Sequence, residues 1–306
     1  MPSLTTIACG LVFPEGPVWM PDGTVLVTEI IGQTVQRCRL DGTRETVAVL
    51  GGGPNGAAIG PDGALYVCNN GGMKHMLIPS RGWILPGEEP DDYVTGSIQR
   101  VDLATGAVST LYTACDGRRL RGPNDIVFDA AGGFWFTDHG KLRDRDRDRG
   151  GVYYATIDGS CIREVLFPLD GPNGIGLSPD GTQLYVAESF PARIWAWEVS
   201  GPGELRIKPH ARVHGGRLMA GLGGYHLIDS LGVDRDGNVC VATLGDHVGI
   251  TVIPPEGGRH WLVPLPGPMP TNICFGGLDM STAFATLSPQ GELVSWAWSS
   301  EEGRDD

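Results

Sequence analysis

Six copies of one short pattern recur along the 306-residue chain. In each copy a turn with an amide or carboxylate residue leads into an apolar run, and a P-D-G-like turn then precedes a second apolar run. The copies are FPEGPVWMPDGTVLVTEI (13–30), GPNGAAIGPDGALYVCNN (53–70), GPNDIVFDAAGGFWFTDHG (122–140), GPNGIGLSPDGTQLYVAES (171–189), DSLGVDRDGNVCVATL (229–244) and TNICFGGLDMSTAFATL (271–287). An average spacing of about 51 residues matches a four-stranded propeller blade. The sequence therefore predicts an all-β, six-bladed β-propeller, formed by residues 1–306 as a single domain.

The two ends of the chain are expected to share the last blade. Between the other copies lie pairs of short strands around a turn, which is the pattern of a hairpin. After the sixth copy only LVSWAWS (293–299) remains, whereas TTIACGLV (5–12) has no partner at the N-terminus. We expect this N-terminal strand to complete the last blade, because closing the ring removes two exposed sheet edges.

Three stretches depart from the repeat. Residues 71–96 are an insertion in the second blade, rich in Gly and Pro, of a length that often forms a lid or a pocket wall. Residues 141–150 (KLRDRDRDRG) alternate in charge and predict a solvated loop. The tail 301–306 is expected to be disordered.

Composition narrows the class of partner. The net charge of −13 disfavours a nucleic acid, which needs a basic surface. Seven scattered cysteines without C-x-x-C spacing indicate reduced thiols. We read no signal peptide and no apolar stretch that could span a membrane. We therefore expect a cytoplasmic protein, monomeric or weakly homo-oligomeric, that acts on a small molecule.

One position of the repeat carries polar side chains in every copy. These residues lie directly before the first apolar strand, and they are Glu15, Asn55, Asn124, Asn173, Asp229 and Asn272. They should ring one mouth of the central channel. Asn and Asp are good turn formers, but Glu is not, and two like charges near one axis are costly unless a cation compensates them. Oxygen ligands without Cys or His favour Ca²⁺, Mg²⁺ or Mn²⁺ over structural zinc.

The motifs resemble those of the senescence-marker-protein/gluconolactonase/luciferin-regenerating-enzyme family, which includes regucalcin. The resemblance covers nearly the whole chain. The motifs that carry it are F-P-E-G-P-V-W (13–19), G-P-N-D-I-V-F-D (122–129), F-T-D (136–138), P-N-G-I-G-L-S-P-D-G (172–181) and D-S-L-G-V-D-R-D-G-N (229–238).

This resemblance implies a lactonase, a carboxylic ester hydrolase that opens a small lactone, most simply a sugar (aldono-)lactone, with metal-activated water. By the matching motifs the ligands of one divalent metal ion are Glu15, Asn124, Asn173 and Asp229. Calcium is the expected ion, and magnesium, manganese, zinc and iron are alternatives. Asp229 would also act as general base. The family's F-T-D-P-P-Y-G loop is replaced here by FTDHG, so the pocket rim should differ.

Further residues are candidates for contact with the substrate. They are Asn55, Arg121, His139, His226 and Asn272. By contrast, Glu29, Asp138 and Glu188 recur after the second strand of their blades and are expected to be structural hydrogen-bond acceptors.

Two other functions remain open from the sequence. One is a related metal-dependent hydrolase of other esters or organophosphates, similar to diisopropylfluorophosphatase. The other is a calcium- or ligand-binding propeller without turnover, because a fold does not by itself establish an activity.

Overall fold

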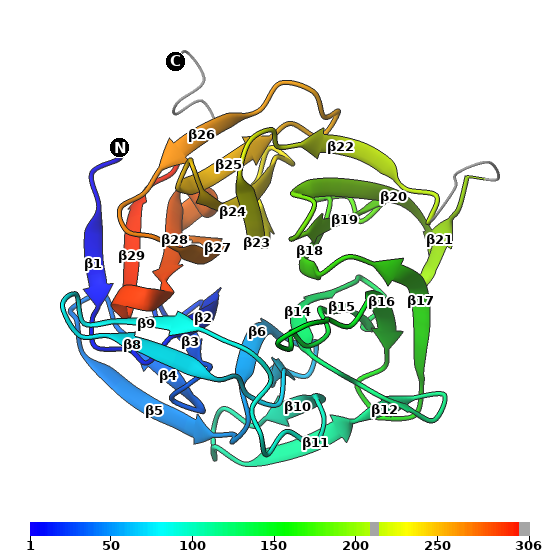
Figure 1. Cartoon of the computed structure of the whole chain (residues 1–306), viewed down its shortest axis with the longest axis horizontal. Coiled ribbons are helices and arrows are strands. Elements are labelled where there is room, and N and C mark those ends of the chain that lie inside the picture. The colour runs from blue at the N-terminus through cyan, green and yellow to red at the C-terminus, as the bar shows by residue number, and fades with distance from the viewer. Residues whose placement is uncertain (209–213, 300–306) are drawn as a thin grey trace.

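The computed structural model describes residues 1–208 and 214–299. In this part of the chain nearly all regular structure is β-strand, arranged as six antiparallel sheets around a central channel (Figure 1). The predicted six-bladed propeller is confirmed. No helix among the described residues is long and apolar enough to cross a membrane.

The blades are numbered in the order of their innermost strands. From the channel outward, blade 1 contains β2 (Pro14–Trp19), β3 (Val25–Glu29), β4 (Thr34–Cys38) and β5 (Arg44–Val49), and blade 2 contains β6 (Pro54–Ile59), β7 (Leu65–Asn69), β10 (Ser97–Val101) and β11 (Val108–Tyr112). Blade 3 contains β14 (Pro123–Phe128), β15 (Phe134–Asp138), β16 (Gly150–Ala155) and β17 (Ile162–Leu169), and blade 4 contains β18 (Pro172–Leu177), β19 (Gln183–Glu188), β20 (Arg193–Gly201) and β21 (Glu204–Arg206), with β22 (Arg217–Gly221) also paired to β20. Blade 5 contains β23 (His226–Val233), β24 (Val239–Gly245), β25 (Gly249–Ile253) and β26 (Trp261–Pro264), and blade 6 contains β27 (Pro270–Gly276), β28 (Thr282–Leu287), β29 (Glu292–Ala297) and β1 (Thr5–Ala8). The remaining elements are the hairpins β8 (His75–Ile78) with β9 (Trp83–Pro86) and β12 (Ala114–Cys115) with β13 (Arg118–Arg119), and the 3₁₀ turns η1 (Leu278–Met280) and η2 (Ser288–Gln290).

Each sequence copy corresponds to the two inner strands of a blade and the turn between them. The turn chemistry explains why this unit forms locally. The Asp22 carboxylate accepts a hydrogen bond from the backbone N–H of Thr24 at 3.0 Å, and Gly23 between them has a φ of 82°, which favours glycine. The fourth copy repeats this bond between Asp180 and Thr182, at 3.1 Å.

The N-terminal strand closes the ring. β1 pairs antiparallel with β29, with Thr5 opposite Ser295 and Thr6 opposite Val294. Ile7 is only 4% exposed and packs in the core between blades 6 and 1. The predicted closure is therefore confirmed.

Neighbouring blades are held together by apolar packing and by a repeated hydroxyl contact. Trp135 and Trp197 are fully buried in one inter-blade core. A hydroxyl near the end of one blade's second strand donates to a carbonyl of the next blade's innermost strand, as from Thr28 to Asn55 O at 2.6 Å and from Thr137 to Asn173 O at 2.5 Å. These bonds position the starts of the innermost strands relative to one another.

The carboxylates at the end of the second strand in blades 1, 3 and 4 are structural, as expected. Asp138 accepts the backbone N–H groups of Arg121, Gly122 and Gly140 at 2.6–3.0 Å. Glu29 accepts Val12 N–H at 2.7 Å, and Glu188 accepts Asp170 N–H at 2.7 Å. Each ties down the segment that leads into the innermost strand of its blade.

The insertion 71–96 forms the hairpin β8–β9, which runs over blade 1 toward blade 6 (Figure 1) and contacts η2 there. Most of the charged segment 141–150 is exposed, as predicted for a solvated loop. Its ends differ, because Lys141 is only 7% exposed and Asp148 pairs with Arg121 at 2.9 Å. One side of the loop therefore becomes part of a wall. The tail 301–306 lies outside the described residues.

Candidate functional site

The six predicted ring residues lie near the starts of the six innermost strands, where each strand departs from regular pairing. In β2 the register breaks between Glu15 and Val18, and in β14 between Pro123 and Ile126. The other four innermost strands break at or beside the equivalent residue. A bulge of this kind re-aims a side chain, and here it turns polar side chains toward the channel.

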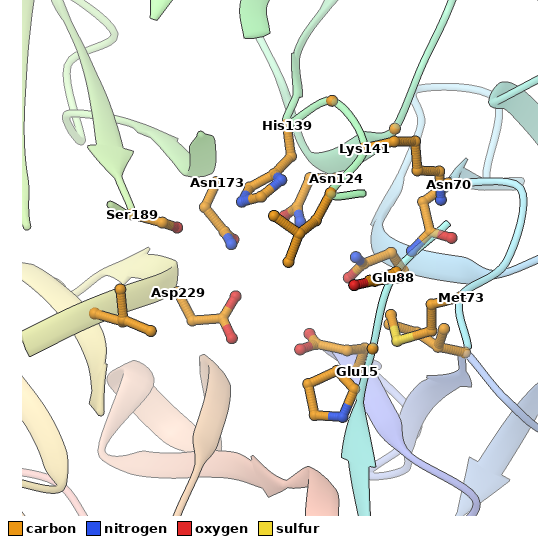
Figure 2. Close-up of a pocket in the computed structure, with 18 of the residues that line it drawn as sticks. Glu15, Asn70, Met73, Glu88, Asn124, His139, Lys141, Asn173, Ser189 and Asp229 are labelled. Carbon is orange, nitrogen blue, oxygen red and sulfur yellow. The ribbon is translucent and has the colours of Figure 1, made fainter. Parts of the chain in front are cut away.

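Four of these side chains converge on one space. Figure 2 shows Glu15, Asn124, Asn173 and Asp229 pointing toward a common centre from blades 1, 3, 4 and 5. All four line a cavity of about 260 Å³ at the channel mouth. Glu15, Asn124 and Asn173 are buried, and Asp229 is partly exposed to the cavity. The structure thus brings together the four residues predicted as metal ligands.

The electrostatics of this centre are unfavourable for two free carboxylates. Burial raises the pKa of Glu15 to about 7. Burial, with the nearby Glu15 charge as the next cause, raises the pKa of Asp229 well above its usual range. Each group is therefore driven toward its neutral form unless a positive charge stands between them.

The donor set fits a hard divalent cation. The buried Oδ1 of Asn124 has no hydrogen-bond partner in the described part of the protein, so it is available as a ligand. Asn173 donates to Asp229, and its Oδ1 accepts from Ser230 Oγ at 3.2 Å. A rotation of this amide by 180° would turn Oδ1 to the centre while the Ser230 hydroxyl accepts from Nδ2. Two carboxylates and two carboxamides are ligands that Ca²⁺, Mg²⁺ and Mn²⁺ accept.

The composition of the centre also limits which ion suits it. Among residues 1–208 and 214–299, no three His, Cys, Asp or Glu side chains form a metal-binding group. A cation at this centre must therefore take amide oxygens as well as carboxylates, which disfavours a thiolate- or imidazole-bound metal.

The predicted substrate contacts separate into two groups. Asn55 and His139 line the cavity. Asn272 does not border the cavity. Its Nδ2 donates to Glu15 Oε2 at 3.2 Å, so it orients the carboxylate of the predicted metal ligand Glu15. Arg121 is paired with Glu89 and Asp148, and His226 stacks on His247, and neither of them borders the cavity.

Several residues of the site were missed in the sequence. Asp125 is buried beside Glu15, and burial raises its pKa to about 7. It occupies the position where three other copies have glycine, and this departure was a visible signal. Glu88, Lys141 and Ser189 also border the cavity. Glu88 and Lys141 come from loops outside the repeat, and Ser189 is the last residue of the fourth copy, where no sequence pattern marked it as a site residue.

Comparisons with known proteins identify the family and the fold. The family model described as SMP-30/Gluconolactonase/LRE-like region matches residues 13–288. The gluconolactonase of Zymomonas mobilis is 26% identical, over 89% of this chain and 76% of that protein. The diisopropyl-fluorophosphatase of Loligo vulgaris is 29% identical, over 60% of this chain and 59% of that protein. A solved gluconolactonase from Xanthomonas campestris is 26% identical, with a TM-score of 0.73 over 96% of this chain and 89% of that one.

Proposed function

This chain belongs to the SMP-30/Gluconolactonase/LRE-like family, and we propose that it is a metal-dependent lactonase. The observation that carries the proposal is the convergence of Glu15, Asn124, Asn173 and Asp229 on one cavity. Relatives named gluconolactonase support lactone opening, and a sugar lactone is the substrate that those names suggest first.

Each residue of the site would have a separate role in hydrolysis. The four side chains would hold one divalent cation, which would polarise the lactone carbonyl and stabilise the charge that develops on its oxygen. Asp229 is the ligand that opens to the cavity, so one carboxylate oxygen can accept the proton of the attacking water. Asn272 holds Glu15 in place through its 3.2 Å hydrogen bond. Neutral His139 can donate a hydrogen bond to the substrate from the wall.

A metal-depletion experiment tests the proposal. Chelator-treated protein should lose hydrolysis of δ-valerolactone and glucono-δ-lactone, and regain it when Ca²⁺, Mg²⁺, Mn²⁺ or Zn²⁺ is added back. The effective ion should also raise the melting temperature, because a ligand at 100 times its Kd stabilises the folded state by about 2.7 kcal/mol. Full activity in verified metal-free protein would refute the proposed metal dependence.

Variants separate binding of the cation from proton transfer. Asp229→Asn should lower kcat by about 10²- to 10⁴-fold, while Glu15→Gln should abolish the thermal shift on metal addition. Asp144→Asn is the control, because its side chain is 87% exposed and does not border the cavity. An Asp229→Asn protein that keeps both the thermal shift and full activity would remove Asp229 as the base.

The relative named diisopropyl-fluorophosphatase favours a second candidate, hydrolysis of phosphorus esters at the same centre. Parallel assays of lactones and phosphotriesters, with and without chelator, distinguish the two. Metal binding without turnover of either class would instead indicate a ligand-binding propeller.

A further inference from the structure

The walls of the cavity differ in character from its floor. The floor is the ring of oxygen-bearing side chains, whereas most of the walls above it are apolar. The apolar wall residues come from several blades and from the inserted segment, and they include Phe13, Met73, Pro86, Leu142, Phe190 and Met269.

Several polar groups in the walls are already bonded within the protein. Ser189 Oγ donates to Ile228 O at 2.5 Å. Lys141 Nζ donates to Gly72 O at 2.6 Å, and Asn70 Oδ1 accepts from Gly72 N–H at 2.8 Å. Asn55 Oδ1 has no hydrogen-bond partner in the described part of the chain, and His139 also borders the cavity, so a substrate hydroxyl can find a partner at these residues but not along the apolar part of the walls.

The inserted hairpin forms an apolar cover over one side of the cavity. Its outgoing end is fixed to blade 3, because Glu89 N–H donates to Leu142 O at 2.8 Å and the Glu89 carboxylate pairs with Arg121 at 3.0 Å. Its strand β9 contacts η2 of blade 6. Met73 and Pro86, at the two ends of the hairpin, are thereby held against the cavity.

The charges at the cavity do not favour an acidic substituent. Figure 2 shows Glu88 near the centre, where it adds a third carboxylate to Glu15 and Asp229. A divalent cation would offset two of these charges, and the Lys141 ammonium, which also borders the cavity, would offset the third. No net positive charge then remains to bind a carboxylate or phosphate on the substrate.

We propose that this site takes neutral lactones whose ring carries an apolar alkyl substituent, in preference to polyhydroxylated sugar lactones. The inference rests on the proposed lactonase function and names its substrate class. The lactone carbonyl faces the oxygen ring, and the alkyl group packs against Met73, Leu142 and Phe190.

Elementary transfer energetics give the expected size of the preference. Each methylene buried in the walls should raise kcat/KM about fourfold until the cavity is filled. A hydroxyl buried against the apolar part of the walls loses its water partners without replacement, which lowers kcat/KM about tenfold. Among lactones of one ring size, kcat/KM should therefore be raised by alkyl substituents and lowered by hydroxyl groups.

A matched set of six-membered lactones tests the proposal with metal-loaded protein. The set is δ-valerolactone, δ-hexalactone, δ-octalactone and glucono-δ-lactone, assayed by acid release and corrected for spontaneous opening. We expect kcat/KM to rise from δ-valerolactone to δ-octalactone and to be at least about tenfold lower for glucono-δ-lactone than for δ-octalactone.

Wall variants test the location of the substituent. Leu142 borders the cavity and is 43% exposed, so Leu142→Gln should fold normally. It should narrow the preference for δ-octalactone over δ-valerolactone by about fivefold. Leu77→Gln is the matched control, because Leu77 on the inserted hairpin is similarly exposed, at 57%, and does not border the cavity. It should leave the preference unchanged.

The outcomes separate this proposal from the one on which it rests. A flat alkyl series, or a preference for glucono-δ-lactone, would overturn the substrate class and leave the lactonase intact. If Leu142→Gln and Leu77→Gln changed the preference for δ-octalactone equally, the alkyl group would not pack against Leu142. Absence of hydrolysis of every lactone with every ion would overturn both proposals.

Discussion

At the scale of single residues, the cavity wall contains a histidine that folding keeps neutral. Burial lowers the pKa of His139 to about 4, whereas a histidine in an unfolded chain titrates near 6.5. Between these values the unfolded state binds more protons than the folded state. The contribution of His139 to stability is therefore lost as the pH falls from about 6.5 toward 4.

His139→Asn should remove this pH dependence. Between pH 7 and pH 5 the wild-type protein should lose about 2 kcal/mol more unfolding free energy than the variant. Urea unfolding at both pH values, with chelator present throughout, measures the difference. His75→Asn, at an exposed position of the inserted hairpin, is the control and should behave as wild type. Equal pH slopes for wild type and His139→Asn would contradict the prediction.

At the scale of elements, the innermost strands lie so close together that some positions admit only glycine. A Cβ added to Gly174 would lie 2.3 Å from the backbone N of Leu231 in the next blade. The equivalent Gly56 would meet the Asn124 carbonyl oxygen at 2.5 Å. The glycine of the P-N-G motif therefore permits the close approach that brings the ring side chains to one centre.

Gly174→Ala should destabilise the protein by about 3 kcal/mol, because backbone atoms cannot move aside as a flexible side chain could. It should also weaken metal binding, since Asn173 is the preceding residue. Gly223→Ala is the control, because an added Cβ there meets nothing within 4 Å. Thermal unfolding with and without metal measures both effects, and a wild-type profile for Gly174→Ala would refute the packing argument.

At the scale of the whole molecule, the ring depends on one pairing between the chain's two ends. β1 and β29 join residues that are far apart in sequence, as in the pair Thr5 and Ser295, which are 290 residues apart. The pairing adds β1 as the outer strand of blade 6 and so joins the two ends of the chain in one blade, which closes the ring.

Ile7→Ala should weaken this closure. Ile7 is 4% exposed in the core between blades 6 and 1, and truncation of a buried isoleucine costs about 2–5 kcal/mol. Thr6→Ala is the control, because Thr6 is exposed on the same strand. Denaturant unfolding should show a lower midpoint for Ile7→Ala only. Equal midpoints for the two variants would mean that β1 contributes little to closure.

The fold and the ring followed from sequence because both are repeated local patterns. Two strands and an Asp-Gly turn form a unit whose geometry depends on neighbouring residues, so six copies predict six blades. The position of Glu15, Asn124, Asn173 and Asp229 within that unit then predicts that they meet, since equivalent points of equivalent blades face the same axis.

The tertiary structure decided which polar groups remain free and what surrounds the ring. Arg121 reads as a substrate contact in sequence, but Glu89 and Asp148, 32 and 27 residues away, take up its guanidinium. Leu142 and Met73 belong to irregular loops, yet the closed ring and the inserted hairpin place both on one cavity wall. A repeat encodes the contacts that recur in every blade, whereas partners contributed by unique loops exist only once the whole chain has folded around the channel.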